Sequence, residues 1–177
     1  MIKNSYKSVI VLFSICLVVA AILAAVNFIT APIIEESEKK AAADALRVVC
    51  PEGDDFEPFS QSLDFDVPTT IKNIYVVSAG ENKIGLVFEI SEKGYAPNLN
   101  IMCGINSDGV ITGIKCLSSG ETLGYEKAYG ESFVGKGREE VSDVDTISGA
   151  TLTTTAFKNA IMTVEKTFNL IWSEVVE

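Results

Sequence analysis

The 177-residue sequence predicts an α+β fold class, in which a domain with a mainly antiparallel sheet covered by helices follows an N-terminal transmembrane helix. Three observations lead to this prediction. A long uncharged apolar run stands near the N-terminus, and several short runs rich in isoleucine and valine follow it. The last 20 or so residues then carry apolar side chains at helical spacing.

The apolar run near the N-terminus predicts a transmembrane helix over residues 9–30. No charged residue occurs from Val9 to Ile34, and the strongly apolar part is about 21 residues long. A helix of that length crosses the ~30 Å hydrocarbon core of a bilayer. A cleaved signal peptide is the alternative interpretation, but its apolar region usually has only about 7 to 15 residues.

The charges on either side of this run predict its orientation. Basic residues and the amino terminus precede it, whereas acidic residues lead the other side: Lys3 and Lys7 against Glu35, Glu36 and Glu38. The positive-inside rule therefore places residues 1–8 in the cytoplasm and the chain from about residue 35 onward outside it. The protein is expected to cross the cell membrane once.

Residues 31–50 are expected to form a juxtamembrane helix. Pro32 stands where the membrane span is expected to end, and apolar residues then recur at helical spacing with charges opposite them: Ala42, Ala45, Leu46 and Val49. Residues 50–55, which include Pro51 and Gly53, stop this helix and begin a loop. The outer domain is therefore expected to span residues 51–177.

Four short runs predict the strands of the sheet: residues 71–77, 84–90, 99–105 and 110–117. Their short connections imply antiparallel pairing. If residues 106–109 make the turn of a hairpin, Cys103 lies opposite residue 112 to 114, and Cys116 lies too far out of register for a disulfide. Both cysteines are interpreted as small buried hydrophobic side chains.

The C-terminal segment predicts an amphipathic helix that covers the sheet. The apolar stripe consists of Ala156, Ala160, Ile161, Val164, Phe168, Ile171, Trp172 and Val175.

The composition excludes several classes of function. Histidine is absent, which rules out a Ser-His-Asp nucleophile system and a histidine-ligated zinc or haem site. The four cysteines include no CxxC pair, so a metal site is not expected. The net charge of −10, without a cluster of lysines and arginines, argues against binding to nucleic acid.

The segment Asp145 to Thr151, with the sequence Asp-Thr-Ile-Ser-Gly-Ala-Thr, is the candidate chemical site. It opens the predicted last helix, and a helix N-terminus offers free N–H groups and a positive dipole end that favour a phosphate. Gly149 lets a ligand approach the backbone closely. On physical grounds alone, the alternative that Ser148, Thr151 and Thr153 serve as N-cap residues is preferred. However, the pattern Asp-x-x-Ser/Thr-Gly-Ala-Ser/Thr arises by chance in a chain this long only on the order of once in a thousand.

At these residues the sequence resembles a known family, the FMN-binding domain of the G subunit of the Rnf complex, which is shared with the C subunit of sodium-pumping NADH:quinone reductase. The resemblance covers nearly the whole chain and includes the apolar anchor, Gly94-Tyr95 and Glu121-Thr122. It implies that a dedicated flavin transferase esterifies Thr151 to the phosphate of FMN. The other residues that the resemblance assigns to the FMN site are Asp145, Ser148, Gly149, Ala150, Leu152, Glu121 and Thr122.

The resemblance also implies a function. Such a complex couples electron flow between ferredoxin and NAD+ to transport of Na+ or H+, and this subunit relays electrons through its covalent FMN on the outer side of the membrane. Other membrane subunits, the flavin transferase and membrane lipid are the implied partners. Because no substrate-binding or acid-base set is visible, the chain is expected to be a redox subunit rather than a complete enzyme. The alternatives are a stand-alone membrane-anchored covalent flavoprotein for extracellular electron transfer and a non-redox anchored binding module.

Two segments depart from the family pattern. The family usually reads Glu-Thr-Pro-Gly-Leu-Gly where this chain has Glu121-Thr122-Leu123-Gly124-Tyr125-Glu126, and residues 96–98, Ala-Pro-Asn, replace a glycine-rich stretch. Tyr125 either stacks on the flavin ring or packs against the protein, and packing is the preferred interpretation. Asp145 is either a recognition or loop-bracing residue or an exposed turn residue, and both interpretations stay open.

Overall fold

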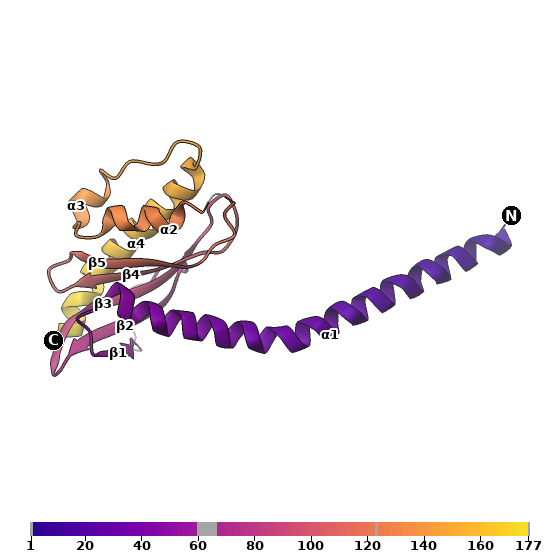
Figure 1. Ribbon diagram of the computed structural model, residues 1–177, viewed down its shortest axis with the longest axis horizontal. Helices are drawn as coiled ribbons and strands as arrows, with labels where there is room; N and C mark the ends of the chain where they lie inside the picture. The colour runs from indigo at the N-terminus through magenta and orange to yellow at the C-terminus, as the bar shows by residue number, and fades with distance from the viewer. Residues whose placement is uncertain (1, 60–66, 123, 177) are drawn as a thin grey trace. The chain divides into compact units, whose positions relative to one another are not determined.

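The computed structural model describes residues 2–59, 67–122 and 124–176, and it divides the chain into two compact units, Met1–Lys40 and Ala41–Glu177. The larger unit contains a five-stranded sheet and the C-terminal helix (Figure 1). The described elements therefore have the predicted fold class, α+β with an antiparallel sheet.

Helix α1 (Ile2–Val49) runs without interruption through both predicted helical segments. The expectation that the first helix ends near Pro32 is therefore wrong, because Pro32 lies inside α1. Proline removes one helical hydrogen bond, but good helix formers such as alanine, glutamate and lysine dominate the following turns. The most apolar stretch of α1 has a mean hydropathy of 3.2, and by length and composition this helix can cross a membrane.

The sheet has the strand order β1-β2-β3-β4-β5, and every neighbouring pair is antiparallel. The four predicted runs are confirmed as β2 (Ile71–Ala79), β3 (Asn82–Glu92), β4 (Leu99–Asn106) and β5 (Ile111–Ser118). The expected loop after α1 instead contains β1 (Asp55–Pro58), which pairs with β2 at the sheet edge. A short strand with charges and a proline is typical of an edge position.

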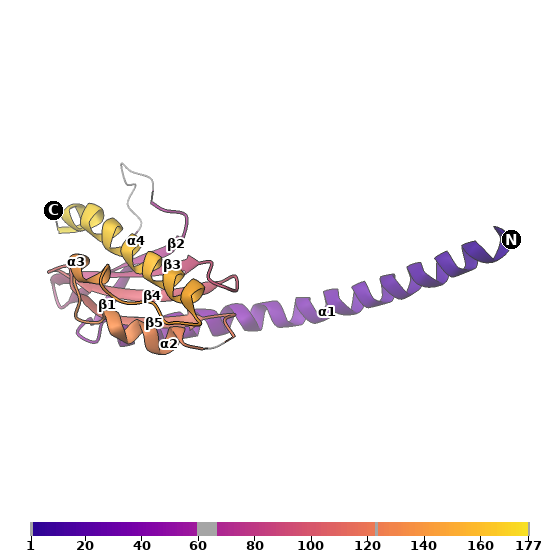
Figure 2. The same ribbon diagram turned by 90° about the horizontal axis from the view of Figure 1, so that it is seen from above.

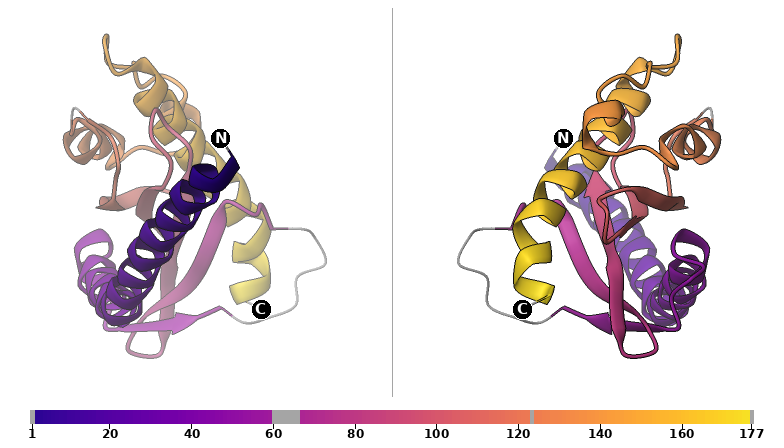
Figure 3. Two further views of the ribbon diagram at one scale, coloured as in Figure 1. Left: turned by 90° about the vertical axis from the view of Figure 1, so that its right-hand side faces the viewer. Right: turned by 90° about the vertical axis from the view of Figure 1, so that its left-hand side faces the viewer.

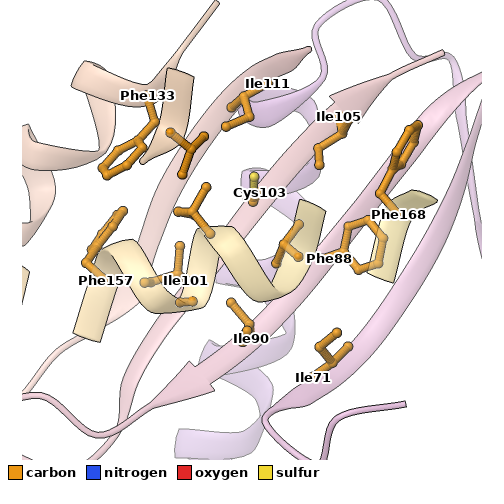
Figure 4. Packing of buried hydrophobic residues seen from close by; sticks show 14 of the residues in the cluster. Ile71, Phe88, Ile90, Ile101, Cys103, Ile105, Ile111, Phe133, Phe157 and Phe168 are labelled. Carbon is orange, nitrogen blue, oxygen red and sulfur yellow. The ribbon is translucent and has the colours of Figure 1, made fainter. Parts of the chain in front are cut away.

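Helix α4 (Thr151–Val176) lies across one face of the sheet (Figure 2; Figure 3, right). Side chains of alternate residues on β3 and β4, including Phe88 and Cys103, form the core together with Phe157 and Phe168 of α4 (Figure 4). The predicted apolar stripe is confirmed, since all its members are buried except Trp172, which is half-buried.

The last turns of α1 pack on the opposite face of the sheet, where Ala45 and Val49 meet Val87 and Met102. A pair of glycines, Gly104 on β4 and Gly113 on β5, makes this contact possible. A Cβ atom on either would lie 2.6 to 2.7 Å from the backbone of Val49. The Thr112 hydroxyl donates a 2.6 Å hydrogen bond to the Val49 carbonyl, which fixes the end of the helix on the sheet.

The cysteine register follows the predicted hairpin. Cys103 pairs with Ile114 across β4 and β5, and neither Cys103 nor Cys116 forms a disulfide with a described residue. Cys103 is fully buried, and burial raises the pKa of its thiol. Cys116 is only half-buried, so the expectation of burial holds fully for Cys103 alone.

Three short helices between β5 and α4 were not predicted: α2 (Glu126–Tyr129), η1 (Gly130–Phe133) and α3 (Arg138–Val141). Tyr129 and Phe133 join Phe157 of α4 in an aromatic cluster with ring centroids 5.2 to 5.8 Å apart. This cluster holds the short helices beside the N-terminal end of α4.

Candidate functional site

The predicted motif ends at the first residue of the long helix, because α4 begins at Thr151. Gly149 has a φ of +84°, a left-handed conformation that side chains rarely adopt. The Ala150 N–H donates to the Ile147 carbonyl at 3.0 Å, and the Thr154 N–H donates to the Ala150 carbonyl at 2.9 Å. The backbone thus makes one tight turn and enters the helix at once, as predicted.

The loop that precedes Thr151 is held by side chains that bond its backbone. The Tyr129 hydroxyl donates to the Asp145 carbonyl at 3.0 Å. The Lys158 ammonium donates to the carbonyls of Ser142 and Val144, the second at 3.0 Å. Both donors come from neighbouring helices, so the position of the motif depends on the packing of α2 and α4.

Thr154, which the sequence analysis did not single out, ties the preceding loop to the first turn of α4. Its hydroxyl accepts a 3.2 Å hydrogen bond from the Ile147 N–H and donates to the Ala150 carbonyl at 3.0 Å. The Thr153 hydroxyl donates to a carboxylate oxygen of Glu121. Among the described residues, no hydroxyl of Ser148, Thr151 or Thr153 accepts a hydrogen bond from an N–H group at the start of α4, so their interpretation as N-cap residues is wrong.

Several polar groups at this helix end remain available to a ligand. The hydroxyls of Ser148 and Thr151 make no hydrogen bond to any other described residue, and both residues are exposed. The N–H groups of Thr151, Leu152 and Thr153 likewise have no acceptor in the described part of the chain. Free N–H groups at the positive end of a 26-residue helix favour an anion such as a phosphate.

A cavity of about 460 Å³ opens beside this helix end, within the range of roughly 300–1,000 Å³ that small-molecule sites occupy. Six of the eight predicted site residues line it: Glu121, Thr122, Gly149, Ala150, Thr151 and Leu152. Its wall also includes residues outside that predicted set: Tyr95, Gly124, Tyr125, Glu126 and Thr153. Segments far apart in the chain therefore meet at Thr151.

The remaining two predicted residues, Asp145 and Ser148, are exposed and do not line the cavity. The Asp145 carboxylate has no hydrogen bond to another described residue, although its carbonyl accepts one from Tyr129. Burial, and secondarily the charge of Asp145, raises the pKa of the Tyr129 hydroxyl, which keeps this donor protonated. Bracing of the loop thus uses the backbone of Asp145 rather than its side chain.

Glu121 joins the two loops that form the cavity wall. One carboxylate oxygen accepts a 3.0 Å hydrogen bond from the Ala96 N–H, and the other accepts from the Thr153 hydroxyl. Gly94 lies so close that a Cβ atom there would collide with the Glu121 carboxylate. The loop that carries Tyr95 is therefore fixed to the first turn of α4 through a single carboxylate.

Three large side chains on the cavity wall remain exposed: Tyr95 by 71%, Leu152 by 66% and Tyr125 by 45%. Tyr125 is thus partly covered by the protein and partly open to solvent, so both interpretations of it, packing and stacking, stay predictions. Its surface is available to an aromatic ligand. Of the other departures from the family pattern, Ala96 serves as the donor to Glu121, and Leu123 lies outside the described residues.

A second cavity, of about 320 Å³, adjoins the first and shares Glu121, Thr122, Gly124 and Glu126 with it. Glu126 is only 3% exposed, and one of its carboxylate oxygens has no hydrogen-bond partner among the described residues. Both carboxylate oxygens of Glu121 thus accept hydrogen bonds, whereas one oxygen of Glu126 accepts none from a described residue.

Two parts of the chain match the models of known protein families. Residues 94–164 match the family model of the FMN-binding domain, and residues 1–49 match that of the RnfG N-terminal region. The chain is 28% identical to the G subunit of the Na+-translocating ferredoxin:NAD+ oxidoreductase complex of Acetobacterium woodii, over 90% of this chain and 89% of the relative. It is 27% identical to the G subunit of the ion-translocating oxidoreductase complex of Methanosarcina acetivorans, over 90% and 92%. It is 25% identical to the G subunit of the proton-translocating ferredoxin:NAD+ oxidoreductase complex of Clostridium ljungdahlii, over 75% of this chain and 67% of the relative.

Proposed function

Because the chain belongs to the family of Rnf complex G subunits, which carry an FMN-binding domain, we propose that it is the electron-relay subunit of a membrane-bound, ion-translocating ferredoxin:NAD+ oxidoreductase complex. Its FMN is esterified through the phosphate to Thr151. The observation that carries this assignment is the exposed Thr151 hydroxyl, which is unused by the fold and lines a cavity at the start of a long helix.

Attachment of the flavin requires an external enzyme. The Thr151 oxygen forms a new bond to the flavin phosphorus, the bond from that phosphorus to its leaving group breaks, and the hydroxyl proton is lost. An unactivated hydroxyl does not carry out this substitution unaided. The chain contains no histidine, and Thr151 makes no hydrogen bond to a described residue that acts as a base. A flavin transferase with an activated flavin nucleotide is therefore the maturation partner.

The residues around Thr151 fit a phosphate and a flat ring system. The N–H groups of Thr151, Leu152 and Thr153 lie at the positive end of the helix dipole and suit the phosphate oxygens. Tyr95 and Tyr125 give the cavity aromatic surfaces suited to a flavin ring. Glu121 keeps the two sides of the cavity together.

When bound, FMN supplies the electron transfer, which no side chain of the chain supplies by itself. The protein holds the cofactor at a constant place and prevents its loss to the surroundings. Helix α1 anchors the chain in the membrane, with residues 1–8 in the cytoplasm and the FMN domain on the outer side. The other membrane subunits of the complex, together with membrane lipid, are its partners.

The attachment site is tested by producing the full chain together with a flavin transferase and measuring flavin fluorescence after denaturing electrophoresis. Thr151→Ala is expected to abolish the fluorescent band, because it removes the hydroxyl oxygen to which the flavin phosphate is attached. Thr155→Ala is the matched control, since Thr155 is an exposed threonine one turn further along the same helix. Peptide mass spectrometry is expected to map FMN minus water to Thr151. Covalent flavin that survives in Thr151→Ala would refute the site.

The place in a complex is tested separately by isolating the chain from native membranes. Co-purification with other membrane subunits and with ferredoxin:NAD+ oxidoreductase activity is expected. A chain that carries flavin but is isolated alone would instead support the stand-alone flavoprotein. The third possibility, a non-redox binding module, predicts that no flavin is attached even with a competent transferase.

A further inference from the structure

Glu126 occupies an unusual position for an ionisable side chain. It is the first residue of α2, it is only 3% exposed, and it lines both cavities. Its Oε2 atom is buried and has no hydrogen-bond partner among the described residues. Buried carboxylate oxygens are nearly always paired, because an unpaired one keeps the full cost of its lost hydration.

The neighbouring carboxylate shows what a structural role looks like in this site. Both oxygens of Glu121 accept hydrogen bonds, one from the Ala96 N–H and one from the Thr153 hydroxyl. Glu165, a buried residue of α4, also has an unpaired oxygen among the described residues, but it lines neither cavity. Among these three carboxylates, only Glu126 combines an unpaired oxygen with a place on the cavity wall.

A hydrogen-bond donor bound in the cavity would give Glu126 the partner that the described residues do not supply. Thr151 lines the same cavity, so a flavin attached to Thr151 shares this space with Glu126. FMN carries two types of uncharged hydrogen-bond donor: the imide N–H of the ring and the O–H groups of the ribityl chain. Glu126 is also a position at which this chain departs from the family pattern described above.

We propose that Glu126 contacts the bound flavin, accepts a hydrogen bond from one of its N–H or O–H groups, and lowers its redox potential through its negative charge. This inference rests on the proposed function. Two-electron reduction with uptake of one proton leaves the flavin with one additional negative charge. A carboxylate that is itself buried disfavours that charge, because water screens it little, so it makes the flavin harder to reduce.

The test is a spectroelectrochemical titration of the purified full chain, matured with a flavin transferase, in mildly alkaline buffer. Glu126→Gln keeps the size of the side chain but removes its charge, and Glu126→Ala removes both the charge and the acceptor. Both variants are expected to show a more positive midpoint potential than the unaltered protein. Glu131→Gln is the control, because Glu131 is an exposed residue of the adjoining η1 helix whose charge is screened by solvent.

Three results overturn the inference in distinguishable ways. Unchanged potentials in both Glu126 variants, with flavin still attached to Thr151, would show that Glu126 does not act on the flavin while the proposed function stands. An equal shift in Glu131→Gln would show an effect of net charge rather than of contact. Absence of covalent flavin from the unaltered protein would remove the proposed function and this inference together.

Discussion

Glu165 makes the stability of the outer domain depend on pH in a direction opposite to that of most carboxylates. It lies on α4, it is only 3% exposed, and one of its oxygens has no hydrogen-bond partner among the described residues. Burial raises the pKa of its carboxyl from 4.5 to about 7, although the positive charge of Arg138 partly opposes this rise. Between pH 4.5 and about 7, the Glu165 carboxyl therefore keeps its proton in the folded protein but has lost it in the unfolded chain.

The sign and size of the effect follow from proton linkage. Below pH 4.5 the carboxyl is protonated in both states and contributes nothing to the pH dependence. Between pH 4.5 and about 7 the folded state binds more protons, so its stability falls as the pH rises. Above about pH 7 the loss of folding stability reaches its full value, about 3 kcal/mol for this change in the pKa of Glu165.

The assay compares the unaltered full chain with Glu165→Gln in detergent, by denaturant unfolding across this pH range. Trp172 is the sole tryptophan, and it stacks on Phe168 of the same helix with centroids 5.4 Å apart, so its fluorescence reports on the packing of α4. The stability difference between variant and parent is expected to rise by about 3 kcal/mol in favour of the variant from acid to neutral pH. Glu174→Gln, an exposed change on the same helix, is expected to show no such trend. A difference for Glu165→Gln that stays constant with pH would refute the reasoning.

Two further predictions concern contacts that position the site. Gly113→Ala is expected to lower the free energy of unfolding by about 1–3 kcal/mol, because the new Cβ lies 2.7 Å from the Val49 backbone. Gly137→Ala, whose Cβ meets nothing closer than 3.8 Å, is the control in the same denaturation assay. Glu121→Ala is expected to speed hydrogen exchange of the Ala96 amide, because its acceptor is lost, and unchanged exchange would contradict the bracing role.

The fold was predictable where local sequence carried a strong pattern. The four runs rich in isoleucine and valine became β2 to β5, and the apolar stripe of the last helix became the buried face of α4. Edge strand β1 was missed because Asp55–Pro58 contains two acidic residues and a proline. The helices α2 and α3 have four residues each, too few for a periodic pattern to identify them. The continuation of α1 through Pro32 was not predicted, because the proline was given more weight as a helix breaker than the helix-forming residues around it.

The candidate site was predictable only in its contiguous part. The segment that ends at Thr151 has a distinctive sequence, and its place at the start of a helix follows from the stripe behind it. Tyr95, in a loop, and Glu126, at the start of α2, lie about 55 and 25 residues before Thr151, and only the tertiary fold brings them to the same cavity. A single tyrosine or glutamate outside a distinctive motif gives no sequence signal for such a meeting.

The threonines at the start of α4 show why the motif needs a structure to be interpreted. Four threonines stand at the start of α4, Thr151, Thr153, Thr154 and Thr155, and the motif distinguishes Thr151 by pattern alone. Helical geometry separates them, because successive residues point about 100° apart around the axis. Thr154 is buried and bonds the preceding loop, and Thr153 reaches the Glu121 carboxylate, while Thr155 faces solvent. With these bracing roles filled by its neighbours, Thr151 keeps at the cavity wall a hydroxyl that no described residue uses, which is the condition for the attachment proposed above.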